Sequence, residues 1–178
     1  MSFRAARVSV QMPSRRVAID FYLVALAGLK QLALVLAPPI LRIALALPFL
    51  RSAMTRWDGP LSLAPATTFL FAQMFKLHIL GGEYPIPFPE VMAYVVASVE
   101  FVLPTLLILG FATRLAALGL LVMTGVIQLV VPDGWANFHL YWAALALAIV
   151  ALGAGVLSLD HLVLLAYRRA THPPPDPA

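Results

Sequence analysis

The chain has 178 residues, of which 62% are hydrophobic and only 11% are charged, and its formal net charge is +4. A soluble domain is typically about 45–50% apolar and about a quarter charged, so this composition excludes both an ordinary soluble globule and a disordered chain. It indicates an integral membrane protein whose length allows one small helical bundle.

The sequence contains no cysteine. This excludes disulfides, cysteine-ligated iron–sulfur clusters, covalently attached haem and thiol electron relays. The twelve Lys and Arg residues lie at the chain ends and helix boundaries and form no basic helix face. The basic balance therefore predicts a membrane topology and not a nucleic-acid partner.

Residues 1–37 are expected to form a basic tail followed by an amphipathic helix. The largely apolar stretch Val17–Ala37 is interrupted by polar residues, and Arg16, Asp20 and Gln31 share one helical stripe. This pattern favours a helix that lies in the membrane interface. A separate membrane span and a signal peptide are the alternatives, although no small-residue cleavage site followed by a polar segment is visible.

The first membrane span is predicted from Pro38-Pro39 to about Arg56, because proline favours the first turn of a helix. The connection that follows, Trp57–Pro89, is long and rich in glycine and proline, and long connections are usually functional or disordered. Its aromatic residues favour an ordered connection, and Thr67–Leu80 is expected to form a short helix within it.

Three further spans are predicted at Glu90–Gly110, Leu115–Val131 and Phe138–Leu157. Together with the first span they indicate an all-α, four-helix transmembrane domain over residues 38–165. The proline-rich residues 166–178 are expected to form a disordered cytoplasmic tail.

Four spans place both termini on the same side of the membrane. That side collects seven arginines, and the opposite side has two basic residues: Arg4, Arg7, Arg15, Arg16, Arg114, Arg168 and Arg169 against Arg56 and Lys76. By the positive-inside rule, both termini are predicted to be cytoplasmic. A fifth span at the start of the chain would weaken this asymmetry.

Ionisable residues inside a span are functional candidates because burying them costs free energy. Glu100 is expected at about 15 Å from either end of its span. Arg51, Thr124, Gln128 and His139 are expected from the midplane outward. We therefore predict a polar pocket that opens to the outer face, with Glu100 at its floor and Arg51 as the counter-ion.

The other charged and polar residues have plainer expected roles. His78, Glu83 and Asp133 are candidate contacts in the outer loops, and Arg42 is expected to snorkel to the cytoplasmic headgroups. A structural alternative is that Glu100 and Arg51 only fix the helix register, while polar residues such as Gln128 join helices by hydrogen bonds.

Quinone chemistry needs a group that exchanges protons, because each quinone oxygen gains or loses a proton with its electron. Glu100 in the expected pocket would be such a group, so a quinone is a possible ligand. Met74 and His78, four residues apart on the expected loop helix, could bind copper(I), which accepts thioether and imidazole ligands. This is a weak candidate, and no firm metal site is predicted.

Several stretches resemble the DoxX family: residues 41–52, 100–110, 113–118 and 153–160. Residues 75–85 and 131–139 resemble one bacterial branch of it, and the likeness extends from about Pro39 to Leu165. The resemblance implies a four-helix protein of the bacterial inner membrane. The family takes its name from a small subunit associated with archaeal thiosulfate:quinone oxidoreductase and terminal quinol oxidase, and some members are associated with redox or metal-stress genes. The resemblance supplies no set of catalytic residues.

Two functional hypotheses follow. In the first, the chain is an accessory subunit of a quinone-linked redox system, without a catalytic centre of its own, whose electrons come from a protein partner. In the second, it is a non-enzymatic membrane component for metal or solute handling, or for the anchoring and assembly of a partner. Membrane lipid and either a protein partner or a second copy are the expected partners.

Overall fold

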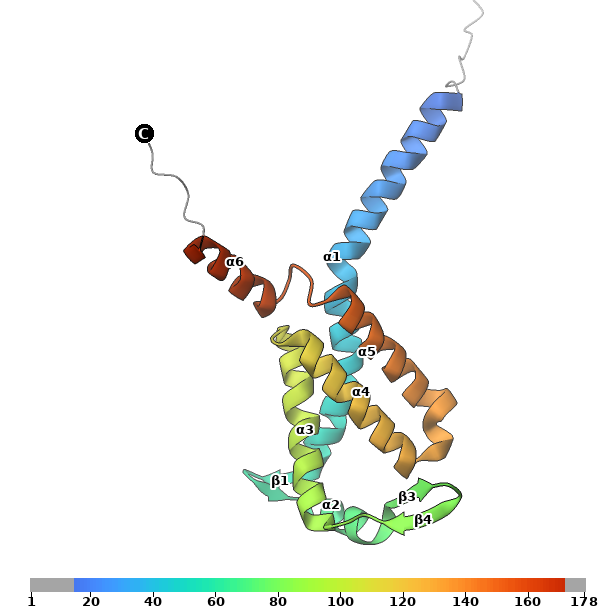
Figure 1. The fold of residues 1–178 in the computed structure, drawn as a ribbon, viewed down its shortest axis with the longest axis vertical. Coiled ribbons are helices and arrows are strands. Elements are labelled where there is room, and N and C mark those ends of the chain that lie inside the picture. Colours follow the sequence, from blue (N-terminus) through green and yellow to red (C-terminus); the bar gives the residue numbers. More distant parts are fainter. Residues whose placement is uncertain (1–14, 172–178) are drawn as a thin grey trace, which may run out of the picture. The chain divides into compact units, whose positions relative to one another are not determined.

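The computed structural model describes residues 15–171, which form helices and two short hairpins (Figure 1). Four helical segments are long and apolar enough to cross a membrane: Ile19–Arg56, Pro89–Leu109, Thr113–Val130 and Pro132–Leu152. This confirms the prediction of an all-α membrane bundle. The chain divides into two compact units, Met1–Leu34 and Val35–Ala178, and every contact described below lies within the second unit.

Helix α1 runs without interruption from Arg15 to Arg56. The prediction that the chain restarts at Pro38-Pro39 was therefore wrong, and the expected interfacial helix is the first part of α1. Membrane helices tolerate proline because neighbouring elements compensate for the lost backbone hydrogen bonds. Here Pro38 is buried against Gly155, where an added Cβ would lie 2.7 Å from the Cβ of Pro38. Whether residues 17–37 lie in the membrane interface stays a prediction.

The long connection after α1 is ordered and holds two antiparallel hairpins. Strand β1 (Trp57–Gly59) pairs with β2 (Ser62–Leu63), and β3 (Lys76–Ile79) pairs with β4 (Gly82–Pro85). Between the hairpins lie helix α2 (Pro65–Phe69) and a π-helical turn (Leu70–Met74).

The prediction of a single helix over Thr67–Leu80 was therefore wrong for the second half of this stretch. The chain reverses at Leu80-Gly81, both of which have positive φ (51° and 82°), as a two-residue hairpin turn of this hand requires. The turn pairs Ile79 with Gly82 and draws the preceding residues into a strand. Met74 and His78 consequently do not share a helix face.

The remaining helices follow in chain order. Helices α3 (Pro89–Leu109) and α4 (Thr113–Val130) match the predicted second and third spans closely. A 3-10 turn (Pro132–Gly134) and a π-helical turn (Trp135–His139) lead into α5 (Leu140–Leu152).

Helix α5 ends five residues before the predicted Leu157, because Gly153 takes a φ of 80° and the chain turns there. A further helix, α6 (Leu159–Thr171), follows. Residues 166–171 are therefore helical, and their assignment to a disordered tail was wrong. The rest of that tail, and residues 1–14 of the basic N-terminal segment, lie outside the described residues.

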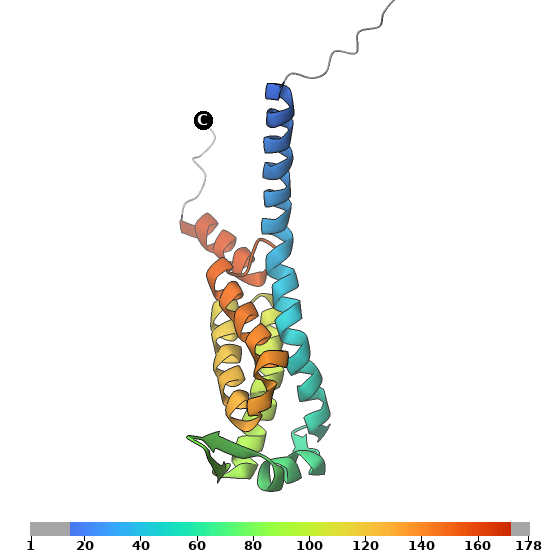
Figure 2. The same cartoon turned by 90° about the vertical axis from the view of Figure 1, so that its right-hand side faces the viewer.

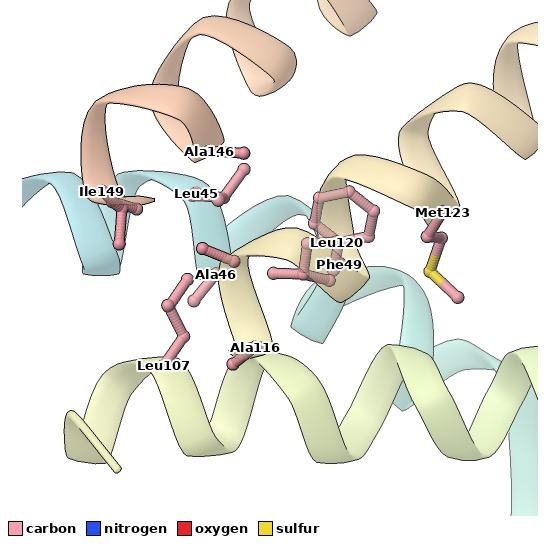
Figure 3. Close-up of a cluster of buried hydrophobic side chains, with 10 residues drawn as sticks. Leu45, Ala46, Phe49, Leu107, Ala116, Leu120, Met123, Ala146 and Ile149 are labelled. Atoms are coloured by element: carbon pink, nitrogen blue, oxygen red, sulfur yellow. The ribbon is translucent and has the colours of Figure 1, made fainter. Parts of the chain in front are cut away.

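The core lies where α1, α3, α4 and α5 cross, and Figure 3 shows its side chains. Large residues from the four helices, such as Phe49, Leu107 and Ile149, are at most 2% exposed. Between them lie fully buried alanines: Ala46, Ala117 and Ala146. Small residues at such crossings let the helices approach closely.

The second unit has two ends, seen in Figure 2. The hairpin end holds the connection between α1 and α3. The turn end holds the short turn between α3 and α4, together with α6.

Candidate functional site

Glu100 lies in α3, is 2% exposed, and is paired with Arg56, the last residue of α1. The guanidinium donates from Nε to Oε2 and from Nη2 to Oε1, the latter over 3.0 Å. Ser52 donates its hydroxyl to Oε2 over 3.1 Å. Such two-pronged pairing is the strongest geometry for an arginine and a carboxylate. The carboxylate is therefore held by three hydrogen bonds, all from α1.

The predicted counter-ion, Arg51, was the wrong arginine. Arg51 is exposed, and it lies about 140° around α1 from Arg56. Ser52 and Arg56, four residues apart, share the face that meets α3. The sequence contains this spacing, but a basic residue at the end of a span by itself predicts only topology.

Arg56 is also tied to the connection that follows it. Its carbonyl oxygen accepts hydrogen bonds from Ala64 N (2.8 Å) and from the hydroxyl of Thr67 (3.1 Å). Its guanidinium lies 5.5 Å from the ring centroid of Phe71, which is a favourable cation–π distance. The end of α1, the connection and α3 are thus joined at one arginine.

A cavity of about 390 Å³ lies beside this pair, at the hairpin end. Side chains of α1, α3, α4, α5 and the connection line it. Its charged or hydroxyl-bearing lining residues are Ser52, Arg56 and Glu100. The other lining residues are apolar or aromatic: Pro48, Phe49, Phe71, Phe75, Leu77, Ile86, Pro87, Met92, Val96, Val126, Ile127, Val130, Val131 and Trp142. An apolar chamber with a few convergent polar groups is the usual composition of a small-molecule site.

The structure does not bring the predicted polar pocket together. Thr124 is buried and donates its hydroxyl to Leu120 O in its own helix (2.7 Å). Thr124, Gln128 and His139 do not line the cavity. The cavity face of α4 carries Val126, Ile127 and Val130 in place of Thr124 and Gln128. Depth in the membrane could be predicted from the sequence, but the direction of each polar side chain could not.

Gln128 and His139 form a separate polar pair that closes the connection from α4 to α5. His139 is 3% exposed, and its Nδ1 lies 2.5 Å from Gln128 Oε1. The amide nitrogen of Gln128 donates to Pro132 O (2.8 Å), so the amide oxygen faces the imidazole and Nδ1 carries the proton. The His139 ring lies 5.3 Å from that of Trp142, which lines the cavity. The pair therefore supports one aromatic wall of the cavity.

The candidate contacts in the loops are spread over the hairpin end. His78 in β3 contacts Leu129 O through Nδ1 (3.1 Å), and its Nε2 lies 3.7 Å from the exposed Glu83 in β4. Asp133 and Met74 are exposed. Among the described residues, no group of three or more His, Cys, Asp or Glu residues could hold a metal ion.

A second buried polar cluster, missed from the sequence, lies at the turn end. Arg42 was expected to snorkel to the headgroups, but it is 3% exposed and donates from Nη2 to Leu157 O (2.5 Å). Asp160 accepts hydrogen bonds from Ala112 N (2.8 Å) and Thr113 N (2.9 Å), at the start of α4. No local sequence signal predicts this cap, because its carboxylate comes from another helix.

The pKa of Asp160 reflects these contacts. Burial of the carboxyl group raises the pKa of Asp160. The hydrogen bonds from Thr113 and Ala112 and the charge of Arg42 lower the pKa by more than burial raises it, so the pKa lies below its ordinary value. The ionised carboxylate is therefore the form that this cluster stabilises.

The comparison with protein families agrees with the resemblance seen in the sequence. The DoxX family model matches residues 37–133, which is more than half of the chain. The chain belongs to the DoxX family. The matched residues run from the middle of α1 through α4 and include Ser52, Arg56 and Glu100 of this DoxX protein. No curated protein and no solved structure matched the chain.

Proposed function

We propose that this DoxX protein binds a quinone in the cavity at its hairpin end and serves as an accessory membrane subunit of a quinone-linked redox system. The observation that carries the proposal is the cavity of about 390 Å³ whose apolar lining is interrupted only by Ser52, Arg56 and Glu100. This volume falls within the range of about 300–1,000 Å³ that is usual for small-molecule sites.

The lining residues suit the two parts of a quinone. Phe49, Phe71 and Trp142 offer aromatic surface to a flat ring. A guanidinium has five N–H donors, and those of Arg56 that do not hold Glu100 can donate to a quinone carbonyl. The Glu100 carboxylate can accept a hydrogen bond from the hydroxyl of the reduced form. Arg56 and Glu100 together would therefore hold both redox forms.

The electrons must come from another protein. Conversion of a quinone to a quinol takes up two electrons and two protons. The chain has no cysteine, and its described part contains no group of three or more His, Asp or Glu residues placed to hold a metal ion. In this proposal the DoxX protein binds and orients the quinone, while a partner supplies the electrons.

A second candidate function, the anchoring of a partner protein, is supported by the two hairpin tips. Leu61 is 85% exposed at the tip of the β1–β2 hairpin, and Leu80 is fully exposed at the tip of the β3–β4 hairpin. Both have positive φ, which is unfavourable for a branched residue. Metal handling has no comparable support, because Met74 and His78 lie on different elements.

We further propose that the protein lies in the bacterial cytoplasmic membrane with the turn end on the cytoplasmic side. Arg114, Arg168 and Arg169 belong to the turn end, while Arg56 and Lys76 belong to the hairpin end. Because the chain has no native cysteine, single cysteines can test this placement. An impermeant maleimide added to intact cells should label Leu80→Cys and leave Phe111→Cys, at a residue 47% exposed in the turn between α3 and α4, unlabelled; the reverse pattern would overturn it.

Quinone retention tests the main proposal. The protein is purified from membranes in mild detergent, and its extract is analysed for quinone. Val130→Phe places a ring in the cavity, whereas Val122→Phe makes the same change on the same helix at a residue that is 69% exposed and outside the lining. The wild type and Val122→Phe should retain quinone and Val130→Phe should lose it. Equal amounts in all three would contradict the proposal.

A further inference from the structure

Helix α6 is attached to the bundle at its first turn. Asp160 donates its backbone N–H to Gly110 O (2.9 Å), and its side chain accepts the two bonds from the start of α4. Arg42 donates a hydrogen bond to Leu157 O, two residues before the helix begins. After that turn α6 has no buried residue.

The attachment point marks one boundary of the membrane-spanning region. Gly110 directly follows the membrane span of α3, and Thr113 begins that of α4. Figure 1 shows α6 starting beside this turn. A helix that starts there and is held to both spans lies at the level where hydrocarbon gives way to headgroups.

Helix α6 carries one continuous apolar stripe. At 3.6 residues per turn an apolar stripe runs along one side of the helix, and its members are all exposed: Leu159, Leu162, Val163, Ala166 and Ala170. His161 and Arg168 lie on the opposite side, between Leu164 and Leu165, and Arg169 lies at the edge of the stripe beside Leu162. An isolated helix of 13 residues is only marginally stable in water, so the stripe requires a surface to cover it.

The charges on and near α6 identify the surface. Arg168 and Arg169 lie in its last turn, and its only acidic residue, Asp160, is already engaged with the start of α4 and with Arg42. Arg114 adds a further positive charge at the turn end. A helix with a continuous apolar stripe and basic residues at its edge and opposite side is typical of those that lie in the membrane interface, where anionic lipids attract the basic residues.

We propose that α6 lies in the membrane interface and binds anionic lipid headgroups through Arg168 and Arg169, with the stripe Leu159, Leu162, Val163, Ala166 and Ala170 facing the acyl chains. This inference is independent of the cavity and of its ligand. It also explains why a helix with no buried residue follows the last membrane span.

Fluorescence quenching in nanodiscs tests the inference on the full chain. A single cysteine is introduced at Val163, in the stripe, or at His161, on the opposite side, and is labelled with an environment-sensitive dye; the sequence has no other cysteine. The nanodiscs contain either phosphatidylcholine alone or a mixture with phosphatidylglycerol, and the quencher is carried on brominated acyl chains.

The dye at position 163 should be quenched by the brominated chains more strongly than the dye at position 161, and more strongly when phosphatidylglycerol is present. Arg168→Gln and Arg169→Gln should each weaken the dependence on phosphatidylglycerol by about fivefold, the factor expected for one basic residue near an anionic surface. A matched Lys76→Gln variant, whose exposed charge lies in β3 at the hairpin end, should leave it unchanged.

Two results would overturn the inference. Equal quenching at both positions, with position 163 open to an aqueous quencher, would show that α6 does not lie in the interface. The dye at position 163 could instead be protected from both quenchers, and only when each nanodisc holds two copies of the chain. That result would show that the stripe packs against a second copy and not against lipid.

Discussion

Arg56 and Glu100 form a two-pronged ion pair that joins the last residue of α1 to the middle of α3 in the wall of an apolar cavity. The pair has two consequences. It fixes how α1 and α3 meet, and it places a donor and an acceptor at one point of a chamber otherwise lined by hydrocarbon. A structural and a ligand-binding role are therefore combined in the same two residues.

Loss of Arg56 should destabilise the fold strongly. Arg56→Gln leaves Glu100 buried without its charge partner, and breaking a buried pair in this way typically costs about 3–5 kcal/mol. Arg51→Gln is the matched control, because Arg51 is exposed five residues earlier on the same helix and should change stability by less than about 0.5 kcal/mol. Thermal unfolding in one detergent measures both, and similar losses for the two variants would contradict this assignment of the pair.

Gly110 should tolerate no side chain. Its φ is 68°, and a Cβ would collide with Arg42 Nη1 and with Ser158. Gly110→Ala should therefore cost about 2 kcal/mol or more. Gly125→Ala is the control within a helix, since nothing lies within 4 Å of its added Cβ, and it should stabilise the protein by about 0.5–1 kcal/mol. If both variants shift the unfolding temperature in the same direction, the close packing at the turn end is contradicted.

Gln128 and His139 should act as one unit. Removal of either partner leaves the other with an unmet hydrogen bond, which costs about 1–3 kcal/mol. The variants Gln128→Ala, His139→Ala and the double variant form a cycle whose coupling energy should be about 1 kcal/mol. Additive effects on the unfolding temperature would show that the two side chains do not depend on each other.

Asp160 should make stability depend on pH in the acid range. Its pKa in the folded chain lies below the ordinary value of 3.8, so the unfolded chain takes up the proton first as the pH falls. The contribution of the ionised carboxylate is complete above about pH 5 and is lost as the pH falls through the folded pKa. The difference in unfolding temperature between the wild type and Asp160→Asn should therefore shrink from pH 5 to pH 3. A difference that grows on acidification would contradict this linkage.

The spans could be predicted from hydropathy, because long apolar runs have few other uses. What could not be predicted was the direction in which each polar side chain points. Glu100 was correctly singled out as buried, but its partner depends on which face of α1 meets α3, and Arg51 and Arg56 both lie near the required depth. The hydrogen bond of Thr124 to the backbone of its own helix and the contact of Gln128 with His139 could not be predicted for the same reason.

Other contacts were harder to predict for a different reason. Asp160 caps α4 from α6, and Pro38 packs on Gly155, so in both cases the decisive neighbour is more than 40 residues away in sequence. The prolines of α1 favoured a break by local rules, yet the packing around Pro38 accommodates a continuous helix. Contacts of this range become visible only when the helices are placed in space.

Photoaffinity labelling with an azido-quinone tests the central claim most directly. The probe is added to the protein in nanodiscs, with and without an excess of unlabelled quinone, and the labelled residues are identified by mass spectrometry. The account predicts competable labelling of residues that line the cavity, such as Phe71, Val96 and Trp142. Labelling confined to exposed residues outside the cavity, such as Val122 and Leu147, and unaffected by the competitor would contradict it.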